Sequence, residues 1–198
     1  MDKKDKHNQR MAKKKEIVDA RIAEAQEERG ILLLLKGNGK GKSSSAFGTM
    51  ARAVGHGKRV AVLQFTKGWD DTGEYLLFKD HELIDWHVMG HGFTWETQNF
   101  DQDKAAAEKA WEMAATLLND ERYFMVVLDE MTYSIKYKYL DADVVSKAIQ
   151  NRPKDQTVIV TGRAMPKELE AIADTISEVK DVEHAFRKGV KAQAGIEF

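Results

Sequence analysis

The stretch "ILLLLKGNGKGKSSS", residues 31–45, decides the fold class, because an apolar run passes directly into a segment rich in glycine and lysine. Residues 36–45 hold three glycines and three lysines, a composition that suits the interior of neither a helix nor a strand. The following "AFGTMARAVGHG" continues a helix that we expect to begin near Ser43. A buried strand, a glycine-rich loop and a helix, in this order, predict a phosphate-binding loop.

Within this loop, glycines allow positive φ and let backbone N–H groups form an anion cradle with the helix N-terminus. Lys42 places a positive charge at the phosphates, and Ser43 offers a hydroxyl to Mg²⁺. Lys40 is either a second cation at the phosphates or a solvent-facing lysine. Lys36 stands at the first glycine position of G-x-x-x-x-G-K-[ST], so the match to that pattern is incomplete. The predicted ATP-binding residues are Gly37, Asn38, Gly39, Lys40, Gly41, Lys42, Ser43 and Ser44. The alternative, a basic glycine-rich turn without a ligand, does not explain why all these elements occur in order.

Short apolar runs alternate with helical patterns along the chain, which is typical of βαβ units. Several runs are apolar at successive positions, as expected for strands of a parallel sheet covered by helices on both faces. We therefore predict a three-layer α/β fold with a mostly parallel central sheet. The predicted strands are 31–35, 59–65, 84–89, 124–129 and 157–162.

Two internal helices are predicted, at 102–119, which is rich in alanine, and at 141–151, which opens at Asp141. A third helix, at 12–28, carries only a narrow apolar stripe made of Val18, Ile22 and Ala25, so we expect it to dock on another surface. The chain accordingly divides into a basic N-terminal tail with a lid helix, 1–28, and one domain, 29–198.

Composition narrows the classes of function. The formal net charge of −1 gives no general attraction to nucleic acid or to an anionic membrane, and no run approaches the roughly 20 apolar residues of a membrane span. The absence of cysteine excludes disulfides and thiolate metal sites. The N-terminal residues lack the apolar segment of a secretory signal. We expect a soluble cytoplasmic protein.

The run "FMVVLDE" ends an apolar strand at Asp129 and Glu130, which resembles a Walker B element. In an open α/β sheet, ligands bind beyond the carboxyl ends of the strands, where this acidic pair and the phosphate loop would meet. Asp129 is predicted on the metal side, directly or through water, and Glu130 is expected to bind metal, position substrate or act as a base. The alternative is that both acids only cap the strand.

These residues indicate a nucleoside triphosphate with Mg²⁺, but phosphate loops serve many reactions. The loop "GHGFTWETQN", residues 90–99, carries Phe93 and Trp95 in a polar setting after a strand. Large rings on such a loop favour contact with a ligand, although folding back onto the core explains them equally well.

The chain resembles the P-loop type of ATP:corrinoid adenosyltransferase, also called cob(I)yrinic acid a,c-diamide or cob(I)alamin adenosyltransferase. The resemblance runs through the blocks containing "KGNGKGKSSS", "GHGFTWETQN", "VVLDEMTY", "TVIVTGR" and "HAFRKGVKAQAGIEF", and covers nearly everything after about residue 16. Lys36 in place of threonine, and serines at 43–45 in place of a Thr-Thr-Ala-like run, are its departures from the family pattern.

This resemblance implies a RecA-like fold, a homodimer, and transfer of the 5′-deoxyadenosyl group from ATP to a reduced Co(I) corrinoid with release of triphosphate. It implies Mg²⁺ or Mn²⁺ as cofactor and a flavodoxin-like or flavin electron donor. Lys42 and Glu130 would be catalytic, and Ser43, Asp129 and Glu130 would hold the metal. Phe93 and Trp95 would lie on the corrinoid side and displace the lower axial ligand. The N-terminal helix would close over an active site, its own or the partner's.

The residues alone leave two rival classes open. A RecA-like P-loop ATPase would use Glu130 to activate water and would release orthophosphate, and a non-catalytic ATP-binding module would give no product. The sequence shows no convincing Ser, Cys or His nucleophile, which agrees with a reaction whose nucleophile is cobalt itself.

Overall fold

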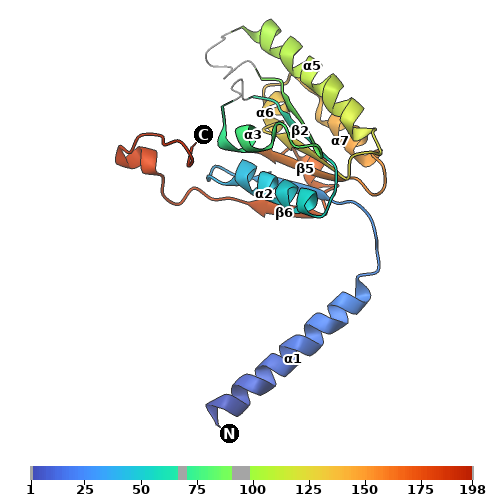
Figure 1. The fold of residues 1–198 in the computed structure, drawn as a ribbon, viewed down its shortest axis with the longest axis vertical. Coiled ribbons are helices and arrows are strands. Elements are labelled where there is room, and N and C mark those ends of the chain that lie inside the picture. The colour runs from blue at the N-terminus through green and yellow to red at the C-terminus, as the bar shows by residue number, and fades with distance from the viewer. Residues whose placement is uncertain (1, 67–70, 91–98, 198) are drawn as a thin grey trace.

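A computed structural model describes residues 2–66, 71–90 and 99–197 of the chain. Its six strands form one sheet in the order β3-β2-β4-β5-β1-β6, and every neighbouring pair is parallel. Helices cover the sheet on both sides (Figure 1). The predicted α/β fold with a parallel central sheet is confirmed. The strands are β1 (Leu32–Lys36), β2 (Val60–Gln64), β3 (Ile84–Val88), β4 (Met125–Asp129), β5 (Thr157–Gly162) and β6 (Thr175–Glu178).

Two of the helices begin at capping side chains that the sequence already offers. Asn99 accepts a hydrogen bond from the Gln102 N–H at 3.2 Å, and Asp141 accepts one from the Asp143 N–H at 2.8 Å. The helices expected at 102–119 and 141–151 therefore form close to those bounds. The helices are α1 (Lys3–Glu24), α2 (Lys42–Gly55), α3 (Gly73–Phe78), α5 (Phe100–Leu118), α6 (Thr132–Lys136), α7 (Ala142–Gln150), α8 (Lys167–Glu170) and the 3₁₀ helix η1 (Ala185–Lys188).

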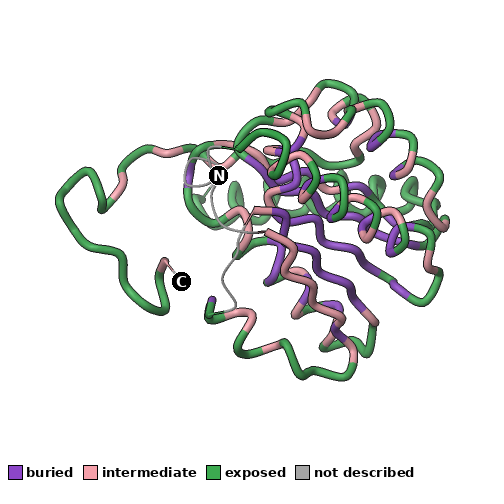
Figure 2. The backbone as a smooth tube through the Cα atoms, turned by 90° about the horizontal axis from the view of Figure 1, so that it is seen from above, coloured by how far each residue is buried: buried purple, intermediate pink, exposed green. Residues whose placement is uncertain are grey.

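The core lies on both faces of the sheet, because successive side chains of a strand point to opposite faces. In β1, Leu32 and Leu34 pack into a cluster with residues of α5 and α7, whereas Leu35 packs into a second cluster with Phe47 and Met50 of α2. Figure 2 shows the strands as the main buried part of the backbone. The three-layer arrangement follows from these two clusters.

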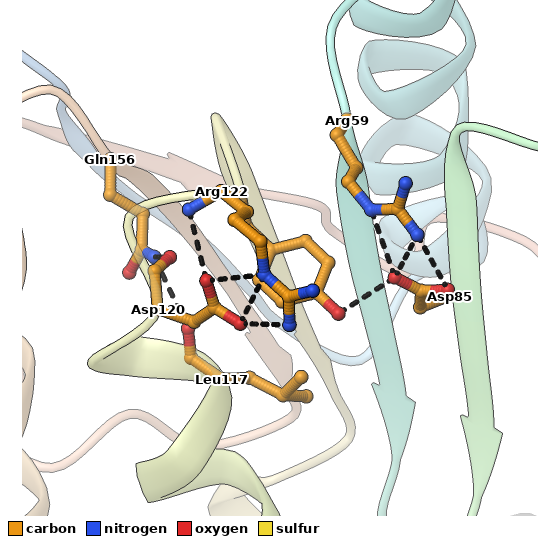
Figure 3. A network of polar contacts seen from close by, with 7 residues as sticks. Arg59, Asp85, Leu117, Asp120, Arg122 and Gln156 are labelled. Carbon is orange, nitrogen blue, oxygen red and sulfur yellow. Dashed lines mark hydrogen bonds and ion pairs between the residues drawn. The ribbon is translucent and has the colours of Figure 1, made fainter.

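A polar network closes the amino-terminal edge of the sheet (Figure 3). Arg59 pairs with Asp85 across β2 and β3 at 2.9 Å, and the Tyr123 hydroxyl donates to the same carboxylate at 2.7 Å. Nearby, Arg122 pairs with Asp120 at 2.6 Å, and the Gln156 side chain donates to the Asp120 carbonyl at 3.1 Å. These contacts connect the starts of β2, β4 and β5 with β3 and the end of α5.

The N-terminal helix differs from the prediction. It spans Lys3–Glu24 instead of 12–28, and Ala25, expected on its apolar stripe, is the C-cap residue. Figure 1 shows the helix standing away from the sheet, and none of its residues is buried. Val18 is 44% and Ile22 66% exposed, so none of the residues that the structure describes covers the apolar stripe. Among residues 2–66, 71–90 and 99–197, no helix is both long and apolar enough to cross a membrane.

Candidate functional site

The phosphate loop connects β1 to α2 at the carboxyl edge of the sheet. Gly37 and Gly41 have φ of 114° and 110°, and Gly41 is the N-cap of α2. Only glycine adopts such angles without strain. The first-turn amides of α2, at Lys42, Ser43 and Ser44, belong to the group that a helix leaves without internal partners. The loop geometry is thus that of an anion-binding helix N-terminus.

Gly39 differs from the prediction of a positive φ, because the structure places only Gly37 and Gly41 of the loop in that region. Its requirement is steric, since a Cβ on Gly39 would lie 2.6 Å from the Lys180 carbonyl oxygen. The Gly39 N–H donates to the Val179 carbonyl at 2.8 Å, and the Gly37 N–H to the Arg163 carbonyl at 3.1 Å. These two amides fasten the loop to the segments after β5 and β6, and do not face its interior.

Two lysines of the motif have side chains with different surroundings. Lys42 donates from Nζ to the Gly39 carbonyl at 2.7 Å, so its ammonium lies over the loop. Burial, and then the charge of Arg163, lower the pKa of Lys42, whereas Glu130 and Asp129 act in the opposite direction. Lys36 turns away and pairs with Glu170 at 2.5 Å, a hydrogen bond that raises the pKa of Lys36. As the last residue of β1, Lys36 sits where the pattern has glycine, in a backbone conformation that needs none.

Asp129 is the last residue of β4 and is fully buried. Its Oδ1 accepts from the Thr161 hydroxyl at 2.8 Å, and its Oδ2 accepts from the Gln64 amide at 3.2 Å. Trp86 Nε1 donates to Gln64 Oε1 at 3.0 Å, which fixes the orientation of that amide. A carboxylate held in this way keeps a defined direction, as partners of a metal or its water ligands usually do.

Glu130 follows Asp129 with φ of 57°, an unusual value for a residue with a side chain. The Thr161 hydroxyl accepts a hydrogen bond from the Glu130 N–H at 2.8 Å, and the Thr66 hydroxyl donates to Glu130 Oε2. Residues held in sparsely populated backbone regions gather at functional sites. Thr161 thus joins both acids of the pair, from the strand that separates β1 and β4 in the sheet.

Three residues of this site were missed by the sequence analysis: Gln64, Thr66 and Thr161. Gln64 pairs with Asp129 in the register of β2 and β4, and Thr161 follows the pairing of Leu128 with Val160. A polar residue at the end of an otherwise apolar strand was the signal available. Arg163 lies just beyond β5, where its charge acts on Lys42 and on the half-buried Tyr133. The pKa of Tyr133 is raised mainly by burial, and the charge of Arg163 acts in the opposite direction.

The remaining predicted residues are placed as follows. Asn38 is exposed on the loop, Ser44 is exposed in the first turn of α2, and Lys40 pairs with Glu197 near the C-terminus. Phe93 and Trp95 lie outside the described residues. Ser43, in the first turn of α2, offers a hydroxyl, and the oxygen donors of Ser43, Asp129 and Glu130 are of the type that Mg²⁺ prefers. Within the described ranges, no group of three or more His, Asp or Glu residues holds a metal by itself, so phosphate oxygens would complete such a site.

Comparisons with known proteins agree over the full length of the chain. The family described as "ATP:corrinoid adenosyltransferase BtuR/CobO/CobP" matches residues 28–198, and the one described as "Cob(I)alamin adenosyltransferase N terminal" matches residues 1–22. The "Corrinoid adenosyltransferase" of Pseudomonas aeruginosa is 53% identical over 100% of this chain and 98% of its own length.

Two further relatives align with 98% of this chain and over 98% of their own length. They are the "Corrinoid adenosyltransferase" of Escherichia coli, 49% identical, and the "Corrinoid adenosyltransferase CobA" of Salmonella typhimurium, 50% identical. A helicase domain structure from Pyrococcus furiosus aligns with 87% of this chain and 39% of its own at 12% identity and a TM-score of 0.39, a level that supports no conclusion.

Proposed function

This chain belongs to the ATP:corrinoid adenosyltransferase family, and we propose that the residues gathered at the carboxyl edge of its sheet are the active site for that reaction. The enzyme transfers the 5′-deoxyadenosyl group of ATP to the cobalt of a reduced corrinoid. The proposal rests on one observation, the position of Lys42 near Asp129 and Glu130. The charges of both carboxylates act on the Lys42 ammonium.

The reaction needs no nucleophile from the protein. The Co(I) centre donates an electron pair to C5′ of ATP, the C5′–O bond breaks, and its electron pair leaves on triphosphate, while cobalt becomes formally Co(III). The protein must hold the two substrates in line and stabilise the charge that develops on the leaving triphosphate. Each residue of the site therefore either positions a substrate or stabilises this charge.

Lys42, Arg163 and the N-terminus of α2 supply positive charge and N–H donors for the triphosphate. Lys42 now donates to the Gly39 carbonyl, so ATP binding would exchange this contact for one to a phosphate oxygen. Gly37, Gly39 and Gly41 shape the loop, and Asn38, Lys40, Ser43 and Ser44 extend its polar lining. Glu130, fixed by Thr66 and Thr161, would position the nucleotide or the water ligands of a cation.

Ser43, Asp129 and Glu130 would hold Mg²⁺ or Mn²⁺ together with the phosphates. When bound, the cation would neutralise charge on the triphosphate. The buried and doubly hydrogen-bonded Asp129 fits contact through a water ligand, because both of its oxygens already accept a hydrogen bond. Hard oxygen donors and the absence of cysteine agree with this choice of metal.

The corrinoid side of the proposal comes from the family. Phe93 and Trp95 would displace the lower axial ligand, because apolar surroundings favour four-coordinate cobalt. A flavodoxin-like or flavin donor would reduce Co(II), a homodimer would form, and residues 1–28 would act as a lid. The uncovered apolar stripe of α1 supports a lid or a partner contact. We place the enzyme in the cytoplasm, which agrees with its lack of cysteine.

The site is tested by the Lys42→Ala variant, with Lys58→Ala as control because Lys58 is an exposed lysine at the opposite edge of the sheet. We expect Lys42→Ala to keep its circular dichroism spectrum and lose MgATP binding, measured by calorimetry, whereas Lys58→Ala binds as the parent does. Unchanged MgATP affinity in the folded Lys42→Ala protein would place the nucleotide elsewhere.

A further inference from the structure

Four aromatic side chains form a continuous surface at the carboxyl edge of the sheet, here named the aromatic ridge. It consists of Phe100 at the start of α5, Tyr133 in α6, and Tyr137 and Tyr139 directly after α6. The rings of Tyr133 and Tyr137 are stacked, with centroids 6.2 Å apart. The Tyr137 and Tyr139 centroids are 5.9 Å apart, and those of Tyr139 and Phe100 5.3 Å. The four rings therefore form one connected surface.

The ridge is continuous with the proposed active site. The charge of Arg163 acts on the Tyr133 hydroxyl as well as on Lys42. Tyr133, Tyr137 and Tyr139 also line a cavity of about 40 Å³ with Thr66, the residue that holds Glu130. The ridge thus runs outward from the triphosphate end of the site, on the side where Glu130 lies.

Burial of the core does not account for the ridge. Phe100 is 56% and Tyr137 37% exposed, and neither belongs to the two hydrophobic clusters of the sheet. Tyr133 and Tyr139 are half-buried and connect these two exposed rings to the proposed active site. A connected patch of partly exposed rings beside such a site is a common mark of a ligand surface. Lys136 Nζ lies over the Tyr137 ring, 5.7 Å from the ring centroid.

We propose that the aromatic ridge is the surface on which the corrin macrocycle of the second substrate lies, which makes Tyr137 a residue that positions the corrinoid. The inference rests on the proposed active site, since it assigns the second substrate to a surface next to the triphosphate. A corrin is a broad, flat ring with methyl groups and amide or carboxylate side chains at its rim. Tyrosine rings offer broad apolar faces on which such a ring can lie.

The cavity beside the ridge limits how the macrocycle fits. At about 40 Å³ it is large enough for a small group or a few water molecules and far too small for a corrin. The macrocycle must therefore lie across the mouth of the cavity, with at most one rim substituent inside. The Ser134 side chain and the Thr66 hydroxyl, both at this cavity, supply polar atoms for such a substituent.

The opposing view is that the rings only hold α5 against α6, as the contact between Phe100 and Tyr139 does. In that case, truncation of a ring would lower the melting temperature without changing the affinity for the corrinoid. Steady-state constants for the corrinoid therefore separate the two roles, because packing alone does not set a KM.

The test uses three variants of the full-length enzyme: Tyr137→Ala, Tyr137→Phe and the control Phe124→Ala. Phe124 matches Tyr137 closely, being 38% exposed with Lys58 over its ring at 5.3 Å, but it precedes β4 at the amino edge of the sheet. With MgATP and a corrinoid already reduced to Co(I), kcat and both KM values are measured for each protein, together with its melting temperature.

We expect Tyr137→Ala to raise the corrinoid KM about tenfold and to leave the KM for ATP within about twofold, as for the loss of one ring contact. Tyr137→Phe, which keeps the ring, and Phe124→Ala should both resemble the parent enzyme. An unchanged corrinoid KM in Tyr137→Ala, or an equal rise in Phe124→Ala, would overturn the proposal. Failure of the proposed function would appear differently, as a parent enzyme that adenosylates no corrinoid.

Discussion

Thr161 connects the two acidic residues of the site by a single hydroxyl, which donates to Asp129 and accepts from the Glu130 N–H. Replacing Thr161 by valine keeps the shape of the side chain and removes both hydrogen bonds. We expect a loss of roughly 1–3 kcal/mol in the free energy of unfolding, because a buried carboxylate oxygen and a backbone N–H lose a partner. We also expect kcat to fall about tenfold or more, since Asp129 and Glu130 lose their orientation.

A matched control comes from the other end of the same strand. Thr157 is buried at the amino end of β5, and its hydroxyl accepts from the Ile31 N–H at 3.3 Å. Thr157→Val should lower stability and leave kcat unchanged. Equal effects of both variants on kcat, measured with urea titrations alongside, would show that Thr161 acts only through stability.

Single residues also show which parts of the site could be predicted from the sequence. The order of strand, glycines, lysine and helix predicted the phosphate loop. It explained all three glycines by a positive φ, which holds for Gly37 and Gly41 but not for Gly39. Gly39 is required by the approach of the Lys180 carbonyl, a contact between segments about 140 positions apart that no local pattern contains. Gln64 and Thr161 were missed because their role depends on register with β4, which the sequence alone does not give.

Among the elements, β6 is the strand that the sequence did not predict. All four residues of Thr175–Glu178 are exposed, so the apolar run that revealed the other strands is missing. Backbone pairing with β1 holds this edge strand, and Asp174 reinforces its start by accepting from the Leu32 N–H at 2.8 Å and from Arg29 at 2.5 Å.

Asp174 makes the attachment of β6 dependent on pH. The Arg29 hydrogen bond and then the Leu32 N–H hold the pKa of Asp174 at about 2, below the value of about 4 in an unfolded chain. A carboxylate whose pKa is lowered in the folded state stabilises the fold above pH 4, and this stabilisation is lost as the pH falls toward 2.

We expect Asp174→Asn to lower the free energy of unfolding by about 1 kcal/mol at pH 7 and to reduce the loss of stability between pH 4 and 2. Thermal melts across this range measure it, with exposed Asp155→Asn as control. An unchanged pH dependence in Asp174→Asn would exclude this carboxylate as the cause.

Removal of residues 1–28 tests the lid helix. Because no residue of α1 is buried, the chain beginning at Arg29 should fold, with a free energy of unfolding within about 0.5 kcal/mol of the parent. Corrinoid turnover should fall, since the apolar stripe of α1 would no longer cover an active site. Aggregation or loss of the folding transition would instead mean that α1 is part of the core of the assembly.

For the whole molecule, fold and chemistry were predictable to different degrees. Alternation of apolar runs and helical patterns was enough for the three-layer α/β fold, because buried parallel strands have a local signature. The glycine-rich loop and "FMVVLDE" were enough to predict a nucleotide site at the carboxyl edge, and this site stays a prediction. The corrinoid was not predictable from physical pattern, and it came from resemblance along the whole chain. The aromatic ridge depends on tertiary contacts between α5 and α6, which are absent from any one stretch of sequence.

The central claim is that ATP bound at the carboxyl edge of this sheet releases triphosphate when Co(I) attacks C5′. The identity of the phosphate product tests this claim most directly. The enzyme is incubated with MgATP and a chemically reduced corrinoid, loss of the Co(I) absorbance is followed, and the phosphate products are separated by ion-exchange chromatography. The account predicts one triphosphate for each Co(I) consumed, and none with Lys42→Ala. Orthophosphate formed at the same rate with or without the corrinoid, and no triphosphate, would contradict it and indicate an ATPase.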